Sequence, residues 1–229
     1  TVITEIIEGV QNTIFKKEKS NDFYNNSVSF YLKGLLFNHI LWEGYGEYFF
    51  SGYKEDNTNA EVRLSYKFMR NELGFKTSYQ NEYPDYLYRN YSSNHFQWNN
   101  SSLKSSVELK ARVYYENQKY NFNTNLSYIQ ISNYLFLDNQ TNVSQYTDNL
   151  KIYSGEIYKK LNLGPIRSVT RFVYQKTTND SIMSLPEYNL YQSLFYERLS
   201  KFKNTGGELL WQVGVDFRYA SEHKADAYM

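Results

Sequence analysis

Apolar and polar side chains alternate along most of this chain. The clearest window spans residues 60–72. Its apolar positions are Val62, Leu64, Tyr66 and Phe68, and the charged positions between them are Glu61, Arg63 and Lys67. Successive side chains of a β-strand point to opposite sides, so this window predicts a strand that separates an apolar medium from a wet one.

The same alternation returns in two further windows, at residues 107–115 and 209–220. If the apolar positions face lipid, the polar positions of all three windows face a water-filled lumen. This parity gives nine candidate pore-lining residues: Glu61, Arg63, Lys67, Glu108, Lys110, Arg112, Gln212, Asp216 and Arg218. Charges of both signs in a pore would form a weak filter on solutes. Alternatively, these charges pair across the strands and fill the lumen.

A period of two extends over most of the chain from residue 27. It predicts about eleven strands, at residues 28–37, 39–53, 60–72, 74–82, 93–100, 105–116, 120–131, 148–159, 166–176, 189–199 and 207–220. Short polar links at 70–74 and 116–119 suit antiparallel hairpins, whereas the links at 81–93, 137–148 and 177–188 are longer. The fold class predicted is all-β, an antiparallel up-and-down transmembrane β-barrel with short turns on one rim and long loops on the other.

Composition favours a membrane over a soluble sheet. The chain has 25 Tyr and 15 Phe in 229 residues, yet its mean hydropathy is −0.68. Aromatic residues gather at the ends of the expected strands, where a barrel carries its aromatic girdles. The expected girdle residues are Tyr45, Tyr48, Phe49, Phe50, Phe96, Trp98, Tyr114, Tyr115, Tyr134, Phe136, Phe172, Tyr174, Tyr191, Phe195 and Tyr196. The expected strands also approach the roughly 9–11 residues that a tilted membrane strand needs. The alternative is a long soluble sheet whose exposed aromatic face binds carbohydrate.

The first 26 residues differ from the rest. Ile3, Ile6, Ile7 and Val10 have helix-like spacing, and a charge run follows at 16–19. We therefore divide the chain into a lead-in, plug or loop segment at 1–26 and a barrel portion at 27–229. No apolar run is long enough for a membrane helix, and the sequence shows no signal peptide at its start, so we expect either a removed leader or an internal piece.

Residues with catalytic or metal-binding chemistry are sparse. The chain has no cysteine, and its three histidines, His39, His95 and His223, show no metal-ligand spacing. Ser92 and Ser93 lie close to His95, but a catalytic triad is assembled in space, and proximity in sequence is weak support for one. With 25 basic and 24 acidic residues, there is no net field to attract nucleic acid. We expect that the protein is not an enzyme and that it binds no cofactor, no metal and no nucleic acid.

Several aromatic-rich motifs carry a family resemblance. They are Arg171-Phe172-Val173-Tyr174-Gln175, Ser184-Leu185-Pro186-Glu187-Tyr188, Leu194-Phe195-Tyr196-Glu197, the segment 213–219, the segment 94–100 and the closing Ala227-Tyr228-Met229. With these motifs the chain resembles the putative porin family of Bacteroidota outer membranes. The resemblance implies a cleaved signal peptide, an outer-membrane barrel and a channel role.

Family members are longer, and their chains continue after a motif like the closing one. The stretch 221–226 does not resemble a final barrel strand, and eleven strands would be an odd number for a bacterial barrel. We therefore expect the 229 residues to be part of a larger barrel.

These patterns lead to two functional hypotheses. The first is an outer-membrane porin-like channel for the diffusion of small hydrophilic solutes. The second is an outer-membrane barrel with a filled lumen, whose long loops bind a partner or a glycan. The expected partners are outer-membrane lipid and small hydrophilic solutes, with a second copy of the chain or other outer-membrane proteins as further candidates.

Overall fold

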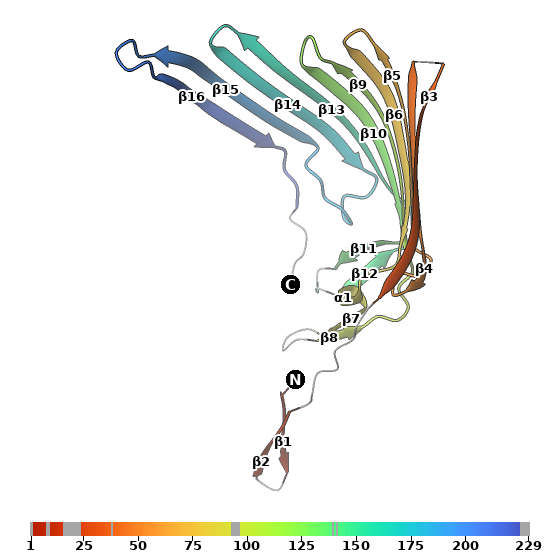
Figure 1. The fold of residues 1–229 in the computed structure, drawn as a ribbon. Helices are drawn as coiled ribbons and strands as arrows, with labels where there is room; N and C mark the ends of the chain where they lie inside the picture. Colours follow the sequence, from red (N-terminus) through yellow and green to blue (C-terminus); the bar gives the residue numbers. More distant parts are fainter. Residues whose placement is uncertain are drawn as a thin grey trace.

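Ten long antiparallel strands form the main sheet of the protein (Figure 1). A computed structural model describes residues 2–7, 10–15, 24–37, 39–92, 97–138, 140 and 142–224. The sheet has the order β16-β15-β14-β13-β10-β9-β6-β5-β4-β3. Its strands are β3 (Asn25–Leu36), β4 (Ile40–Gly52), β5 (Thr58–Phe68), β6 (Asn71–Glu82), β9 (Ser106–Asn117), β10 (Phe122–Ser132), β13 (Leu150–Leu163), β14 (Ile166–Thr177), β15 (Tyr188–Lys201) and β16 (Glu208–Ala220).

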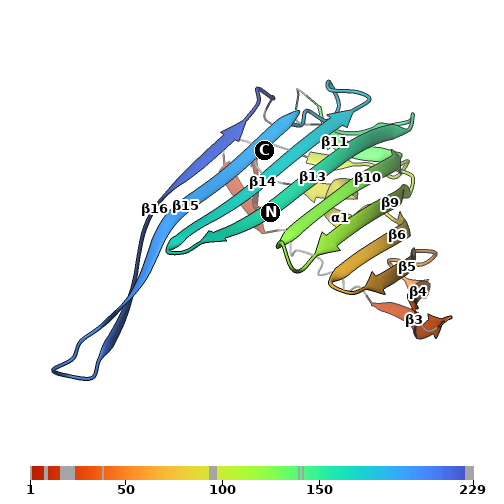
Figure 2. The same cartoon turned by 90° about the horizontal axis from the view of Figure 1, so that it is seen from above.

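The sheet curves into an arc but does not close (Figures 1 and 2). Strands β3 and β16 form its two edges, and every strand between them pairs with its neighbours on both sides. The all-β class and the antiparallel meander are therefore confirmed. The closed barrel is not confirmed, and the larger barrel expected from the sequence stays a prediction.

The strand expected at 93–100 is wrong as a member of the sheet, because β6 pairs directly with β9. Between β6 and β9 the described residues contain a short helix α1 (Tyr86–Arg89) and two three-residue strands, β7 (Asn90–Ser92) and β8 (Gln97–Asn99), which pair with each other. The Trp98 ring stacks on Tyr91 at 4.7 Å, and its Nε1 donates to the Leu87 carbonyl at 2.9 Å. The aromatic residues of this stretch therefore pack within a local insert and not in the main sheet. The main sheet has ten strands, so the odd strand number expected from the sequence is wrong.

The lead-in segment contains a hairpin of its own. Strands β1 (Val2–Ile7) and β2 (Val10–Phe15) pair antiparallel. The helix-like spacing of Ile3, Ile6, Ile7 and Val10 thus coincides with extended backbone. β-Branched side chains are abundant in both strands, and they favour strand over helix. Whether residues 1–26 act as a plug stays a prediction.

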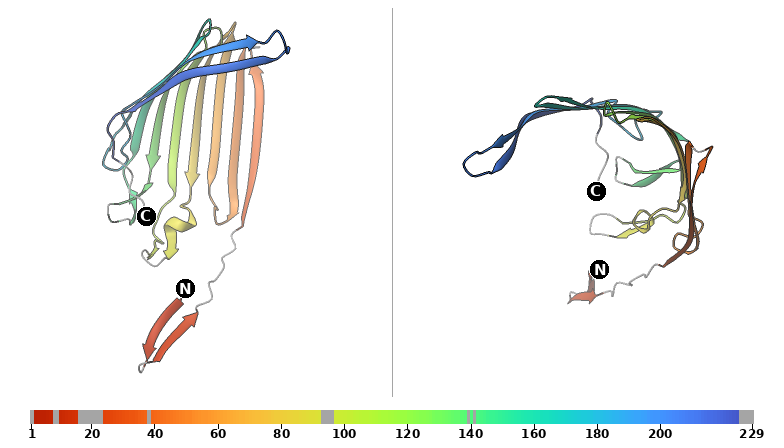
Figure 3. Two further views of the ribbon diagram at one scale, coloured as in Figure 1. Left: turned by 90° about the vertical axis from the view of Figure 1, so that its left-hand side faces the viewer. Right: turned by 45° about the horizontal axis from the view of Figure 1, so that its top comes forward.

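A second insert covers one face of the sheet at its long-loop end. It consists of β11 (Tyr134–Leu137) and β12 (Val143–Tyr146), which form a two-stranded sheet. Ile131, Leu150 and Ile152 lie beneath it and are buried. Partly buried hydrophobic side chains from β10, the insert and the loop 178–187 pack against these three: Ile129, Tyr134, Tyr146, Met183 and Leu185. Both inserts lie within the arc (Figure 3), so the covered face is the concave one.

The convex face is apolar and carries rings towards both rims. Near the short turns, Tyr66 stacks on Phe68 at 5.5 Å and Tyr196 lies 5.4 Å from Trp211. Near the long loops, Tyr128 lies 5.3 Å from Tyr153. Smaller aliphatic side chains occupy the middle, and many side chains of this face are exposed. Two aromatic bands around an aliphatic centre are the profile of a bilayer-facing surface.

Three glycines of the sheet lie directly opposite an aromatic residue of the neighbouring strand whose ring atoms occupy the space of a Cβ. The pairs are Gly34 with Trp42, Gly46 with Phe30 and Gly74 with Tyr114. At Gly74, an added Cβ would come within 2.1 Å of the Tyr114 ring. This position requires glycine because the ring lies flat over the backbone, as when an aromatic residue covers a strand glycine.

Candidate functional site

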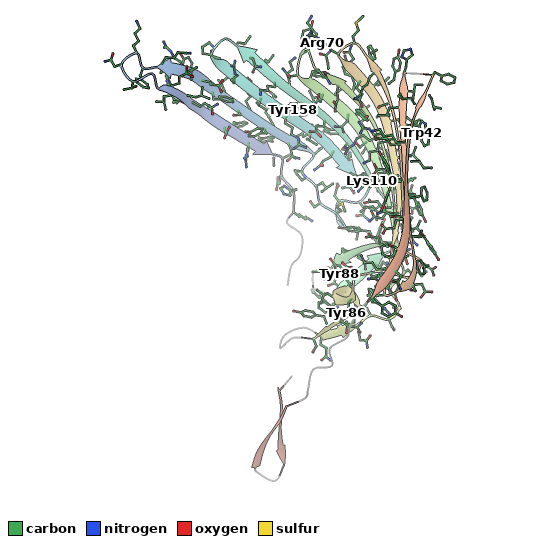
Figure 4. All side chains as sticks on the ribbon, viewed as in Figure 1. Trp42, Arg70, Tyr86, Tyr88, Lys110 and Tyr158 are labelled. Carbon is green, nitrogen blue, oxygen red and sulfur yellow. The ribbon has the colours of Figure 1, made fainter. Side chains whose placement is uncertain are left out.

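The register places all nine candidate pore-lining residues on the concave face. Arg63 faces Lys76, which faces Arg112 in β9, while Lys110 and Glu108 continue the same row along β9. In the second half of the sheet, Gln212, Asp216 and Arg218 share the face of Glu197 and Tyr191. Figure 4 shows Lys110 on the concave side and Trp42 on the convex side. That these residues line a pore stays a prediction.

An ion-pair network centred on Arg63 occupies the concave face of β3 to β9. The Arg63 guanidinium contacts Glu72 at 3.0 Å and Glu43 at 3.6 Å. Lys33 lies 3.0 Å from Glu43, and Lys67 lies 3.4 Å from Glu72. The network therefore crosses strands β3, β4, β5 and β6, and each of its two carboxylates is shared between two cations.

Tyr114 joins this network from β9. Arg63 Nε donates to its hydroxyl oxygen at 2.9 Å, and the hydroxyl donates to Glu72 Oε1 at 2.9 Å. The guanidinium carbon also lies 5.6 Å from the centre of the Tyr114 ring. Because Gly74 leaves room for the ring, the phenol can reach across β6 to Arg63. The carboxylates of Glu43 and Glu72 and the hydroxyl and ring of Tyr114 thus hold Arg63 in one orientation.

Similar pairs continue along the concave face. Arg171 Nε lies 2.6 Å from Glu156 Oε1, and Asn125 donates to the other oxygen of Glu156 at 3.3 Å. Lys76 pairs with Glu61 at 2.8 Å. These side chains border a hollow of about 530 Å³. Its lining residues are Glu43, Glu61, Arg63, Lys76, Arg112, Tyr114, Glu116, Asn123, Thr124, Asn125, Glu156, Tyr158 and Arg171. The hollow is polar and holds four acidic and four basic side chains.

The nine candidates do not form one site. Glu61, Arg63 and Arg112 line the hollow, and Lys67 is linked to Arg63 through Glu72. Lys110 and Glu108 pair with each other at 2.6 Å, nearer the long loops.

The remaining three candidates lie on the edge strand β16. Tyr191 donates to Asp216 at 3.3 Å, Arg218 lies 5.4 Å from the Tyr191 ring, and Gln212 donates to Glu197. These contacts belong to the far end of the arc, away from the network around Arg63.

Sequence reasoning missed Glu72 because it placed the turn at 70–74. The turn occupies Met69 and Arg70, so β6 begins at Asn71 and Glu72 faces inward opposite Lys67. The positive φ of Met69, 53°, marks this turn and is not evident from the residue type. Glu43, Glu156 and Arg171 could have been found by carrying the inward parity into their strands.

Several aromatic residues expected in the outer girdle are not on the convex face. Tyr114 contacts Arg63, Tyr45 donates to Glu47, and Tyr191 donates to Asp216, all on the concave face. Tyr134 and Phe136 belong to the insert strand β11. A tyrosine has both an apolar ring and a hydrogen-bonding hydroxyl, so it suits either face of the sheet. Its position in the alternating pattern determines on which face it lies.

The sites considered for catalysis and metal binding gain no support. Ser93 and His95 lie outside the described residues, so the structure does not test their proximity to Ser92. Within the described ranges, no cluster of three or more His, Asp or Glu side chains could hold a metal ion. Among those residues, too, no helix has the length and apolar character that crossing a membrane would require.

Long antiparallel strands with an apolar convex face and a charged concave face are typical of β-sheet proteins that separate lipid from water. The fold fits an outer-membrane protein. The chain belongs to a porin family: the family model described as "Putative porin" matches residues 5–229. No curated protein matches the chain. Family membership supports a porin-like outer-membrane protein in general.

Proposed function

We propose that the protein forms a porin-like channel through the bacterial outer membrane for the passive diffusion of small hydrophilic solutes. The observation that carries this proposal is the division of one sheet into an apolar convex face and a concave face lined with paired charges. Family membership supports the location and the channel role. That the membrane belongs to a member of the Bacteroidota stays a prediction from the sequence.

The paired charges also indicate how such a channel would select. Glu43, Glu72 and Glu156 each lie beside a guanidinium, so carboxylates and cations alternate across the hollow. A solute on this face meets a field directed along the sheet instead of a net potential of one sign. We expect weak selection by charge and better passage of polar solutes that are neutral overall.

Conductance of the full-length protein in a planar bilayer tests the channel. Arg63→Leu leaves Glu43 and Glu72 with less compensating charge, so ion preference should move towards cations. The combined change Lys110→Leu and Arg112→Leu should shift preference in the same direction. Lys176→Leu is the matched control, because the register places Lys176 beside Tyr153 on the convex face. Unchanged conductance and ion preference in both concave-face variants would count against the lining roles of these residues.

The inserts favour a second candidate, a barrel with a filled lumen that acts as an interaction or glycan-binding protein. The insert β11–β12 and the loop 178–187 pack on the concave face through the cluster at Leu150. Replacement of residues 134–146 by a short flexible linker separates the candidates. A wild-type protein that inserts without conducting, and a shortened variant that conducts, would favour the filled lumen. Self-association and protein partners stay predictions.

A further inference from the structure

The two rims of the sheet carry opposite charge. The short connections are 37–39, 69–70, 118–121, 164–165 and 202–207, and their charged residues are all basic: Arg70, Lys119 and Lys203. Figure 4 shows Arg70 at this rim. The long connections 53–57, 83–105, 133–149 and 178–187 are mainly acidic. They contain Glu55, Asp56, Asp85, Asp138, Asp148, Asp180 and Glu187, with Lys54, Arg89 and Lys104 as their basic residues.

The convex face is basic, like the short-turn rim. By the register, the charged residues of the ten strands that face outward are Lys151, Lys159, Lys176 and Arg198, and none of them is acidic. Acidic strand residues such as Glu116, Glu156 and Glu197 face the concave side. A negative group that approaches the short-turn rim from outside therefore meets cations alone.

Two of these cations flank one exposed ring. Lys159 lies opposite Phe122, the first residue of β10, and its Nζ donates to the Tyr120 carbonyl at 2.6 Å. Lys159 Nζ is 5.5 Å from the centre of the Tyr120 ring, and Lys119 Nζ is 5.1 Å from it. Tyr120 is 56% exposed. In the part of the chain that the structure describes, neither lysine forms an ion pair with a carboxylate.

An apolar groove lies on the same strands. It has a volume of about 470 Å³ and includes Val113, Leu126 and Tyr153, from β9, β10 and β13. Leu126 is four residues from Phe122, which corresponds to about 13 Å along a strand. A cationic group at the rim and an apolar groove below it match the two parts of a phospholipid, a phosphate and an acyl chain.

We propose that Lys119, Tyr120 and Lys159 bind the phosphate group of an anionic phospholipid whose acyl chain lies in the groove at Leu126. The ammonium groups bind phosphate as point charges, and the tyrosine ring lies at the boundary between headgroups and hydrocarbon. This site rests on the proposed insertion of the convex face into a bilayer. It would associate anionic lipid with the short-turn rim, which in outer-membrane barrels is the periplasmic one.

Lipid retention by the full-length protein tests the site. The protein is reconstituted in phosphatidylcholine vesicles with a minor fraction of phosphatidylglycerol, extracted in mild detergent, and its bound lipids are counted by native mass spectrometry. Lys119→Gln with Lys159→Gln should lower phosphatidylglycerol retention by roughly 25-fold, since each basic residue near an anionic surface contributes about 1 kcal/mol, or about fivefold. Leu126→Trp, which fills the groove, should lower retention with both lysines intact.

The matched control is Lys151→Gln with Lys176→Gln, which removes two outward lysines at the opposite rim. Equal retention in the wild type and the Lys119/Lys159 variant would overturn the site, as would an equal loss in the control. Displacement of the lipid by millimolar inorganic phosphate would show a simple phosphate site instead. Insertion into pure phosphatidylcholine, followed by protease protection, reports separately on the membrane proposal. Failure to insert there would overturn both proposals.

Discussion

The concave face contains two regions that differ in kind although they share one parity. Around Arg63, inward-facing side chains are charged, and their ion pairs and hydrogen bonds border an open hollow. At the long-loop end, the inward-facing side chains of Ile131, Leu150 and Ile152 are apolar and buried by the insert. Alternation in sequence therefore determines the direction of a side chain. The medium that it meets depends on what the connections place over it.

Removal of the leucine beneath the insert should have the largest effect on this contrast. Leu150 is 0% exposed, so Leu150→Ala should weaken the docking of β11–β12 by about 2–5 kcal/mol through lost contacts and a cavity. Backbone amides of the insert, at residues 134–137 and 143–146, should exchange on the order of 100-fold faster by hydrogen–deuterium exchange.

Leu163→Ala is the matched control for this variant. Leu163 lies at the opposite end of the same strand, β13, and its side chain is 65% exposed. Its substitution should leave exchange in the insert unchanged. If Leu150→Ala also leaves exchange unchanged, the buried cluster does not hold the insert.

An intermediate effect is expected in the charged region. Tyr114→Phe removes the hydroxyl that accepts from Arg63 and donates to Glu72, which should lower the free energy of unfolding by about 1–2 kcal/mol. Urea unfolding in lipid vesicles measures this change. Tyr79→Phe, which by the register lies on the convex face of β6, is the control and should have little effect. A smaller loss in Tyr114→Phe than in the control would mean that the network does not stabilise the sheet.

The smallest effect concerns pH and the tip of the insert. Asp138 accepts from the backbone amides of Asn142 at 2.9 Å and Gln140 at 2.8 Å. The Asn142 amide, followed by the Gln140 amide, holds the pKa of Asp138 below its ordinary value of 3.8, although burial acts in the opposite direction. A lowered pKa stabilises the folded tip above pH 3.8, and this contribution is lost as the pH falls through the lowered value.

Amide chemical shifts of Gln140 and Asn142 should therefore titrate below pH 3.8. Asp138→Asn should abolish that titration and loosen the tip at neutral pH, whereas Asp148→Asn, outside the tip, should preserve it. A titration of these amides above pH 3.8 would contradict the assignment of the lowered pKa.

Features that depend on residues close together in the sequence were predicted correctly, whereas those that depend on residues far apart were not. Ten strands were predicted because alternation and hairpin turns are local properties. Of the strand expected at 93–100, residues 97–99 form β8, but β8 pairs with β7 and not with the main sheet. The Trp98 ring stacks within this small insert, and alternation does not distinguish such a contact from pairing in the sheet. Prediction of the Arg63 network required the turn between β5 and β6 to be placed within one residue. The cluster at Leu150 depends on side chains that are up to 56 positions apart, from Ile129 to Leu185.

The glycine–aromatic pairs bear on how the strands find their register during assembly. A ring opposite a glycine fits over bare backbone, whereas a slip of two residues would place the ring against a side chain and leave the glycine uncovered. Two of the three pairs join β3 with β4, which follow each other directly in the chain, so this hairpin carries its own alignment signal before the sheet is complete. The third, Gly74 with Tyr114, aligns β6 with β9 across the first long insert. Misaligned pairing of these strands would then be rejected locally, before the rest of the sheet forms.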